Sequence, residues 1–327
     1  MIGLGMAAGH HARALVDLSE RIECVAAYSR TPARRAAFAA QYPTIPTSGD
    51  LDAIFSDQSI EAVLIVTPPS SHLELVQRAT AAKKHVLLEK PLDISWKRSE
   101  ATVNAAKDAG VLLGMVLQNR FRAAALKLDD IVKSGRLGDL VEASAAIRNW
   151  RPQSYYDVEG RGTVARDGGG VLLTQGIHTI DLLLSYGGTP ERVSSFVRTT
   201  RIHTMETEDL VTAAFSFEGG AIGSLNATTC AYPGMPERIE LIGTKGAAVL
   251  TGDTLDAAFI DGTTEIVGGE NAGSGAGANP MAFGHEMHRA LIANFIDAIQ
   301  SGAPLRVNGE DALKAQRFIE AILAARR

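Results

Sequence analysis

The sequence has few cysteines, no excess of positive charge and no long apolar run. Cys24 and Cys230 are the only two cysteines in 327 residues. This number is too small for a disulfide framework or a zinc site built on cysteine pairs, and it is typical of a reducing compartment. The formal net charge of -5 gives no broad positive field for a phosphate backbone, and no basic stripe alternates with aromatic residues. We therefore expect no nucleic-acid partner.

Long apolar segments are also missing. No apolar run approaches the roughly 18 residues that indicate a membrane-spanning helix. The first residues, MIGLGMAAGHHARAL, lack the basic start and unbroken apolar middle of a signal peptide. We expect a cytoplasmic protein that has no membrane partner.

The composition is that of an ordinary globular protein, with 46% hydrophobic and 21% charged residues. A chain of this length is comfortable for two domains, each with its own core. In the first half, apolar strand candidates alternate with helical stretches; the strands are expected at 24–28, 62–66, 85–88 and 111–116. Continuous apolar strands separated by helices indicate a parallel sheet covered on both faces. We predict a doubly wound Rossmann domain over residues 1–119.

The second half has a different texture. Strands rich in Val, Ser and Thr, separated by glycine turns, predict an α+β domain with an antiparallel or mixed sheet over residues 120–327. The stretch Gly268 to Asn279 consists of small and polar residues and is predicted to be a mobile loop. A final helix at about 311–325 closes the chain. This helix is assigned to the second domain, and the alternative is that it packs back on the first domain.

A glycine pattern stands at the start of the chain. Gly3-x-Gly5-x-x-Ala8 lies between a strand and a helix, where small residues let the backbone approach a pyrophosphate at the helix N-terminus. We predict cofactor contacts from the turn, namely Gly3, Gly5, Met6, Ala7 and Ala8. The alternative is a tight turn that uses glycine for steric reasons alone. Only two residues precede Gly3, fewer than the roughly five of a usual strand, which suggests that the natural chain begins further upstream.

The residues after the second strand bear on the choice of cofactor. A NAD-preferring site places an acid about 20 residues after the glycines, to bind the ribose 2'-hydroxyl. Here Ser29, Arg30 and Thr31 stand at that point. Two hydroxyls and a guanidinium suit a 2'-phosphate. We predict NADP, with NAD as the alternative. The alternative to a cofactor role for Arg30 is that it is a surface arginine that precedes a helix.

An unusual pair of charges ends a buried strand. The run of strand formers that starts at His85 leads directly into Glu89, Lys90 and Pro91. Ligands of doubly wound sheets lie beyond the carboxyl ends of the strands, so Lys90 is expected to face the cofactor crevice. Pro91 restricts Lys90 to extended backbone conformations. The alternative is that the two charges only solvate a strand end.

These motifs occur in a fixed order along nearly the whole chain, together with Thr67-Pro68-Pro69-x-x-His72 and with Gly168-Gly169-Gly170 followed by Gly176-Ile177-His178-Thr179-Ile180-Asp181. In this order they resemble those of the Gfo/Idh/MocA oxidoreductases, which include glucose-fructose oxidoreductase and inositol dehydrogenase. The resemblance implies a Rossmann domain, a second domain with an open sheet, and assembly as homodimers or homotetramers. It also implies NAD(P)-dependent hydride transfer to or from a sugar, polyol or related small molecule, with Lys90 and His178 as the catalytic pair.

Two further residues are predicted to act with this pair. Asp181 lies three residues after His178 on a predicted helix, where its carboxylate can orient the imidazole; a purely structural His-Asp pair is the alternative. Inositol dehydrogenase-like members carry Asp four residues before the histidine, whereas this chain has Thr174, followed by Gln175. Thr174 can hydrogen-bond a substrate hydroxyl but cannot carry a charge. His178 and Lys90 must then manage the proton.

The remaining predicted contacts are less direct. Further cofactor contacts are assigned to Thr67, Pro68, Pro69, His72, Glu89, Lys90 and Gln118. The substrate is expected to meet Thr174, His178 and residues from two other stretches, for which packing or an interface is the alternative: Asn119, Arg120, Trp150, Arg151, Tyr155, Tyr156 and Arg166.

No metal site is predicted. His285 and His288 are three residues apart instead of the four of the metalloprotease pattern, so they are interpreted as a solvated helix face. His10 and His11 are expected to shape cofactor contacts.

Two functions of other classes remain as alternatives. One is a regulator of the same fold that binds a nicotinamide nucleotide without turnover; retention of both Lys90 and His178 argues against it. The other is a glycoside hydrolase that uses a tightly held NAD transiently.

Overall fold

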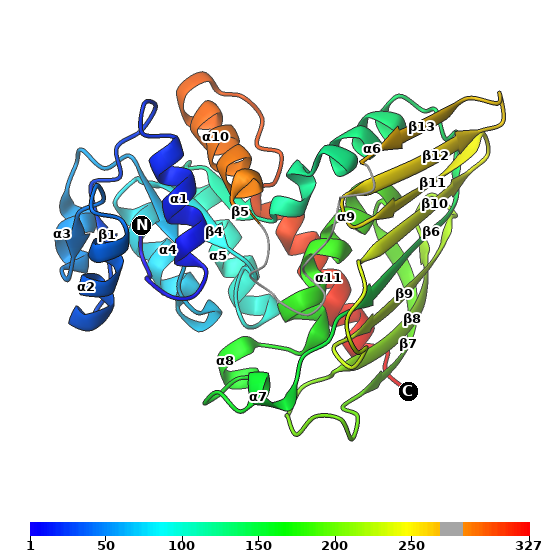
Figure 1. Cartoon of the computed structure of the whole chain (residues 1–327), viewed down its shortest axis with the longest axis horizontal. Coiled ribbons are helices and arrows are strands. Elements are labelled where there is room, and N and C mark those ends of the chain that lie inside the picture. Colours follow the sequence, from blue (N-terminus) through cyan, green and yellow to red (C-terminus); the bar gives the residue numbers. More distant parts are fainter. Residues whose placement is uncertain (269–283) are drawn as a thin grey trace. The chain divides into compact units, whose positions relative to one another are not determined.

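The computed structural model describes residues 1–268 and 284–327, which form two compact units (Figure 1). Unit 1 consists of residues 1–118 and 284–313, and unit 2 contains residues 119–268 and 314–327 of the described chain. The expected division therefore needs a correction, because residues 284–313 had been assigned to the second domain and belong to the first unit. The loop predicted at 268–279 lies outside the described residues, except for Gly268.

A parallel sheet forms the core of unit 1. Its strands follow the order β2, β1, Ile2, β3, β4, β5, because Ile2 forms parallel bridges to both Tyr28 and Ile65. The direction in which the sheet grows reverses between Ile2 and β3, and doubly wound sheets bind their ligands at such a switch point. The strand bounds are β1 (Ala27–Tyr28), β2 (Thr47–Ser48), β3 (Ala62–Ile65), β4 (His85–Glu89) and β5 (Leu113–Val116).

Helices cover this sheet on both faces. Val86, Leu87 and Leu88 are consecutive in β4 and all buried, so neither face of the strand meets solvent. α4 packs against β3, β4 and α5, whereas α10 packs against β4, β5 and α1. The helix bounds are α1 (Ala8–Asp17), α2 (Pro32–Gln41), α3 (Leu51–Ser56), α4 (His72–Ala81), α5 (Trp96–Ala109) and α10 (Glu286–Ser301).

An eight-stranded sheet forms unit 2, in the order β13, β12, β11, β10, β6, β9, β8, β7. All described neighbours in it are antiparallel except β6 and β9, which are parallel. The predicted α+β domain with a mainly antiparallel sheet is thus confirmed. The strand bounds are β6 (Leu140–Arg148), β7 (Pro190–Arg198), β8 (Leu210–Phe217), β9 (Ile222–Thr228), β10 (Arg238–Gly243), β11 (Gly246–Thr251), β12 (Thr254–Phe259) and β13 (Thr264–Val267).

The two faces of this sheet differ. One face carries α6 (Ala123–Lys133) and α9 (Ile177–Gly187), and Phe318 of α11 (Gly309–Ala324) contacts Phe215 of β8 with 4.8 Å between ring centroids (Figure 1). The alternate residues of the strands point to the other face, where several large apolar side chains are exposed, namely Phe196, Ile222, Ile242 and Ile266. In the described part of the chain, no helix combines the length and the apolar character that crossing a membrane requires.

Candidate active site

The glycine turn of unit 1 lies at the switch point of the parallel sheet. Gly3 has a φ of +109°, and a Cβ added to it would lie 2.6 Å from the carbonyl oxygen of Val66. Only glycine therefore fits between the ends of the first strand and β3. Nothing lies within 4 Å of a Cβ added to Gly5, which leaves room for a ligand at the point where the turn enters α1. These features fit the pyrophosphate of a dinucleotide at a helix N-terminus.

The residues proposed for cofactor choice follow β1. The guanidinium of Arg35 donates a hydrogen bond from Nη1 to the carbonyl oxygen of Ser29 at 2.6 Å. Arg35 was not predicted as a site residue; it lies one helical turn beyond Thr31, which precedes α2. Arg30 is exposed. The structure thus adds a second guanidinium at the carboxyl end of β1, and the helical spacing from Thr31 is the sequence signal that could have identified it.

Lys90 directly follows β4, beyond the last residue of the strand. The carboxylate of Glu89 accepts a hydrogen bond from the backbone N–H of Lys90 at 3.0 Å and one from Nε2 of His11 at 2.8 Å. Burial alone raises the pKa of Glu89, but the hydrogen bond from His11 and the neighbouring cationic groups lower it to about 2. A negative charge is therefore held beside Lys90 at neutral pH.

His72 binds the backbone of two loops. Its Nδ1 lies 3.0 Å from the carbonyl oxygen of Pro91 and 3.1 Å from that of Leu92, and its Nε2 lies 2.9 Å from that of Thr67. The residue is fully buried. The predicted direct contact between His72 and a cofactor is therefore corrected, because both ring nitrogens are turned to backbone carbonyls.

The other predicted cofactor residues of unit 1 also lie at the carboxyl ends of its strands. Thr67 accepts a hydrogen bond from the Ser71 hydroxyl at 2.8 Å, and Pro69 begins a short 3₁₀ helix that leads into α4. Gln118 follows β5 and is buried, and its Oε1 has no hydrogen-bond partner among the described residues. A buried amide oxygen that lacks a donor is costly unless a ligand supplies one. Gln118 therefore fits a place in the cofactor site.

In unit 2, the glycine triplet is fixed by an acid that sequence reasoning missed. The carboxylate of Glu208 accepts hydrogen bonds from the backbone N–H groups of Gly170 at 3.0 Å and Leu172 at 3.2 Å. A Cβ added to Gly170 would lie 1.9 Å from the backbone oxygen of Glu208, so the triplet allows close packing. Burial raises the pKa of Glu208. Its distance of 38 residues from the triplet gave no sequence signal.

The triplet leads into an irregular helical segment. Residues Leu172–Gly176 form a π-helical turn before α9, and such turns are frequent at functional sites. The hydroxyl of Thr174 donates to the carbonyl oxygen of Gly170 at 2.6 Å and also contacts the side chain of Gln175. Thr174 is therefore turned toward its own helix.

His178 lies in the first turn of α9, as expected. Asp181 lies on the same helix and is nearly inaccessible to solvent. Both of its oxygens accept hydrogen bonds from Arg120, at 2.7 Å from Nε and 2.6 Å from Nη2. The carboxylate predicted to orient His178 thus also holds Arg120, a residue predicted to bind substrate.

The aromatic stretch before the triplet is partly packed inside unit 2. The hydroxyl of Tyr156 donates to Thr229 Oγ1 at 3.0 Å, and both Tyr156 and Arg151 are buried, which favours packing for these two residues. Tyr155 remains partly exposed; Arg161 lies over its ring at 4.1 Å. The other candidates have local partners: Trp150 stacks edge-on against Tyr232, Arg166 donates to the carbonyl oxygen of Glu159, and the carbonyl oxygen of Asn119 accepts from Arg122.

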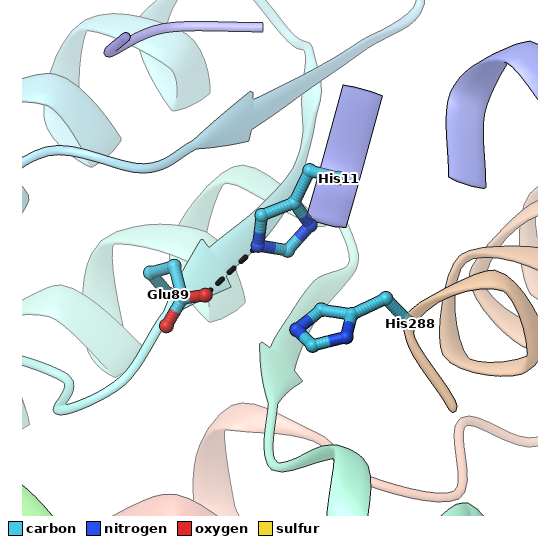
Figure 2. Close-up of side chains that lie close together, drawn as sticks. All are labelled: His11, Glu89 and His288. Atoms are coloured by element: carbon cyan, nitrogen blue, oxygen red, sulfur yellow. Dashed lines mark hydrogen bonds and ion pairs between the residues drawn. The ribbon is translucent and has the colours of Figure 1, made fainter. Parts of the chain in front are cut away.

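The fold brings together two groups of side chains of the types that bind metals. His11, Glu89 and His288 offer donor atoms that all lie within 4.8 Å of one another, and Figure 2 shows the rings of both histidines turned toward the carboxylate. The second group is His203, Asp209 and Cys230. His288 is buried, so the interpretation of His285 and His288 as a solvated helix face is wrong for His288. In both groups, hydrogen bonds of 2.8 Å already join a histidine to the acid.

Both parts of the chain match models of known protein families. A model of the oxidoreductase family with an NAD-binding Rossmann fold matches residues 1–117, and one of the GFO/IDH/MocA C-terminal domain matches residues 125–249. The chain belongs to the Gfo/Idh/MocA family. The resemblance predicted from the ordered motifs is thereby confirmed.

Several curated relatives of this Gfo/Idh/MocA protein are oxidoreductases. The myo-inositol 2-dehydrogenase of Thermotoga maritima is 27% identical over 274 residues, which are 81% of this chain and 77% of that protein. The uncharacterized oxidoreductase C26H5.09c of Schizosaccharomyces pombe is 31% identical over 215 residues, 64% of this chain and 57% of that protein. The chain spans about half the length of the first curated relatives that it matches, at 57%, 45% and 45%.

Solved structures share the fold over nearly the whole chain. The WlbA dehydrogenase from Bordetella pertussis, solved with NADH and UDP-GlcNAcA, is 25% identical with a TM-score of 0.84; the match covers 99% of this chain and 94% of that one. A levoglucosan dehydrogenase solved with NADH and levoglucosan has a TM-score of 0.87 at 23% identity, over 99% and 95% of the two chains. At that identity the second likeness supports the fold alone.

Proposed function

We propose that this protein is an NAD(P)-dependent dehydrogenase that transfers a hydride between a nicotinamide cofactor and a secondary alcohol or carbonyl of a sugar, polyol or related small molecule. One observation carries the proposal. Lys90 directly follows β4, the strand next to β3, at the same edge of the parallel sheet as the Gly3 turn, and ligands of such sheets bind at that edge.

In the proposed mechanism, Lys90 binds the oxygen of the reacting alcohol and stabilises the negative charge that develops on it. His178 takes or relays the hydroxyl proton. Thr174, whose own hydroxyl donates to the carbonyl oxygen of Gly170, accepts a hydrogen bond from a substrate hydroxyl. Asp181 fixes the helix that carries His178 through its pair with Arg120. When bound, the nicotinamide supplies the redox chemistry. Because Lys90 and His178 belong to different units, the proposal requires both to reach one substrate.

We favour NADP as the cofactor. The guanidinium groups of Arg30 and Arg35 near the end of β1 support it, together with the absence of an acid at that point of the sequence. A scyllo-inositol 2-dehydrogenase of Bacillus subtilis, named as NADP-dependent, is 29% identical over 163 residues. NAD is the alternative, since the WlbA dehydrogenase from Bordetella pertussis was solved with NADH.

We also propose a cytoplasmic homo-oligomer that assembles through the outer face of the eight-stranded sheet. The exposed apolar side chains on that face, including Phe196, Ile222 and Ile242, support this surface. Ala214 of β8 and Ser224 of β9 are paired small residues on the same face, and a self-complementary face of this kind can meet a second copy.

The function is tested by mixing the protein with NADP or NAD and a panel of inositols, sugars, anhydrosugars and nucleotide-linked uronic acids, and following the absorbance at 340 nm. We expect net cofactor reduction with at least one polyol or sugar. Glycoside cleavage without net reduction would favour the hydrolase, and cofactor binding without turnover of any compound would favour the regulator.

The matched variants are Lys90→Met and Lys97→Met, because Lys97 is an exposed lysine nearby on α5. We expect Lys90→Met to lower kcat/KM by about 10²–10⁴-fold with cofactor binding kept, and Lys97→Met to behave as the wild type. Near-normal turnover of Lys90→Met would refute the assignment.

A further inference from the structure

The chain around Lys90 is tied to α1 through a single carboxylate. Oε1 of Glu89 accepts from Nε2 of His11 at 2.8 Å, and Oε2 accepts from the backbone N–H of Lys90 at 3.0 Å. His11 is the fourth residue of α1, the helix whose N-terminus follows the glycine turn. The side chain of Glu89 thus joins the helix of the proposed pyrophosphate site to the residue proposed for catalysis.

This connection is shielded from water by further imidazoles. The ring of His288 from α10 lies edge-on to that of His11, with 4.8 Å between centroids, and His10 stacks on His288 at 5.4 Å. The side chain of His11 is fully buried and that of Glu89 is 12% exposed. Figure 2 shows His11 and His288 approaching the carboxylate from different helices. Because so little water screens these groups, their charges act strongly on one another.

Histidines and a lysine are among the titratable groups that act on the carboxylate. Besides His11 and Lys90, several titratable groups act on Glu89 and on the imidazoles beside it. They include His10 and Arg13 from α1, His288 from α10, and His285 directly before α10. Burial, followed by the neighbouring His11, lowers the pKa of His288 to about 3, so this ring is neutral near pH 7. Glu89 therefore carries a negative charge beside these imidazoles and Lys90, and the coupling that lowers its pKa acts in return on Lys90.

The backbone on the other side of Lys90 is also held. The carbonyl oxygens of Pro91 and Leu92 lie 3.0 and 3.1 Å from Nδ1 of His72 on α4. Two buried histidines from two helices thus fix the segment before and after Lys90. The His72 arm touches only backbone, whereas the His11 arm reaches a charge, so the latter can alter the chemistry of Lys90 as well as its position.

We infer that His11, acting through Glu89, is a positioning residue that sets how readily the Lys90 ammonium releases its proton. The inference rests on the proposed function, since it concerns the group proposed to bind the reacting oxygen. The hydrogen bond from His11 draws the charge of Glu89 toward α1. Without that bond the same charge attracts the Lys90 ammonium more strongly, and without the charge the ammonium loses one stabilising neighbour.

Opposite changes at Lys90 follow for two variants. His11→Ala leaves the carboxylate without its donor, so the Lys90 ammonium is stabilised and its titration midpoint rises. Glu89→Gln removes the carboxylate charge, so the midpoint falls. We expect shifts of about 0.5–1 pH unit in each direction. His11→Asn retains a side-chain N–H and should restore a midpoint near that of the wild type.

The experiment labels the lysines of the full chain with [¹³C]dimethyl groups and follows their NMR signals as a function of pH. Lys90→Met identifies the Lys90 signal by its loss. His85→Ala is the matched control, because His85 lies at the opposite end of β4 and accepts from the backbone N–H of Leu112 at 3.0 Å. This control removes a histidine hydrogen bond from the same strand and should leave the Lys90 midpoint unchanged.

A merely structural role for His11 would lower the melting temperature of the variants without moving the Lys90 midpoint in opposite directions. Equal midpoints in His11→Ala and Glu89→Gln, or shifts of the same sign, would overturn the inference. If His11→Ala does not fold, the comparison of His11→Asn with Glu89→Gln decides: a midpoint in Glu89→Gln at or above that in His11→Asn overturns it. The titration needs neither substrate nor cofactor, so its failure is distinguishable from a failure of the proposed dehydrogenase activity.

Discussion

Arg120 holds Asp181 through two parallel hydrogen bonds, from Nε to Oδ2 at 2.7 Å and from Nη2 to Oδ1 at 2.6 Å. The carboxylate is 1% exposed and the arginine side chain 14% exposed. The pair connects the segment after β5 to the helix of His178, so its geometry bears on both a predicted substrate contact and a proposed catalytic residue.

Breaking this pair should cost stability. Arg120→Gln or Asp181→Asn alone is expected to lower the free energy of unfolding by about 3 kcal/mol, because each leaves a desolvated partner. The double variant should lose clearly less than the two single losses combined. Urea unfolding of the four proteins measures this. The exposed pair Arg238–Glu240, with side chains 45% and 46% exposed, is the matched control and should contribute about 0–1 kcal/mol. Additive losses at Arg120 and Asp181 would contradict the expected coupling.

The choice of cofactor should depend on two arginines. Arg30→Ala and Arg35→Ala are each expected to weaken NADP binding by about 10–100-fold, the effect of losing a charged hydrogen bond, and to leave NAD binding nearly unchanged. Fluorescence titration with the reduced cofactors measures both. Arg21→Ala is the control, because Arg21 pairs with Asp297 on the surface of unit 1. Equal weakening for both cofactors would show that Arg35 supports only the backbone of Ser29.

Stability should fall in mild acid because of His288. Its pKa in the folded protein is lowered to about 3 from the ordinary value of 6.5, chiefly by burial. Between these values the unfolded chain binds a proton that the folded protein does not, so the stability present above about pH 6.5 is lost as the pH falls toward 3. The slope from this group is at most about 1.4 kcal/mol per pH unit.

His288→Leu should remove that contribution, and urea unfolding between pH 4.5 and 7 measures the change of slope. His285→Ala is the comparison, since His285 stands at the start of the same helix and bonds Asp17 at the surface. A slope in His288→Leu as steep as in the wild type would assign the acid sensitivity to other groups.

Assembly should depend on the outer face of the eight-stranded sheet. Ile222→Arg places a charge in the middle of the proposed contact and is expected to convert the oligomer into monomers, as measured by light scattering after gel filtration. Val25→Arg changes an exposed apolar side chain of unit 1 and should leave the mass unchanged. A wild-type monomer, or an Ile222→Arg protein of unchanged mass, would rule out this face as the interface.

Local patterns were sufficient for most of the fold. The strand expected at 85–88 is β4, and the helical stretch that follows it is α5, because continuous apolar strands and regular helix signals are properties of neighbouring residues. The strand expected at 24–28 is shorter, since regular pairing is limited to Ala27–Tyr28. Fold class and family were thus readable from the sequence, whereas the assignment of residues 284–313 to unit 1 depends on tertiary packing.

Only part of the candidate site could be predicted from the sequence, because some of its contacts join residues that are far apart in the chain. Lys90 and the Gly3 turn lie in local motifs whose chemistry is visible at once. Glu208 and His288 are far in sequence from the residues they contact, at Gly170 and His11, and only the folded chain brings them together. Spacing within a helix excluded a metalloprotease pattern at His285 and His288, but it carried no information on which side of that helix is buried.

The long connection between β6 and β7 carries most of the residues proposed to recognise the substrate. After β6 the chain forms one further bridge, from Trp150 to Cys230, then the short helices, the glycine triplet and α9, before it joins the sheet again as β7. Most residues proposed to recognise the substrate therefore lie on one excursion, residues 149–189, whose two ends are anchored in separate strands. Replacing this segment as a unit would therefore change the residues proposed to bind the substrate, while the strands of the eight-stranded sheet keep their register.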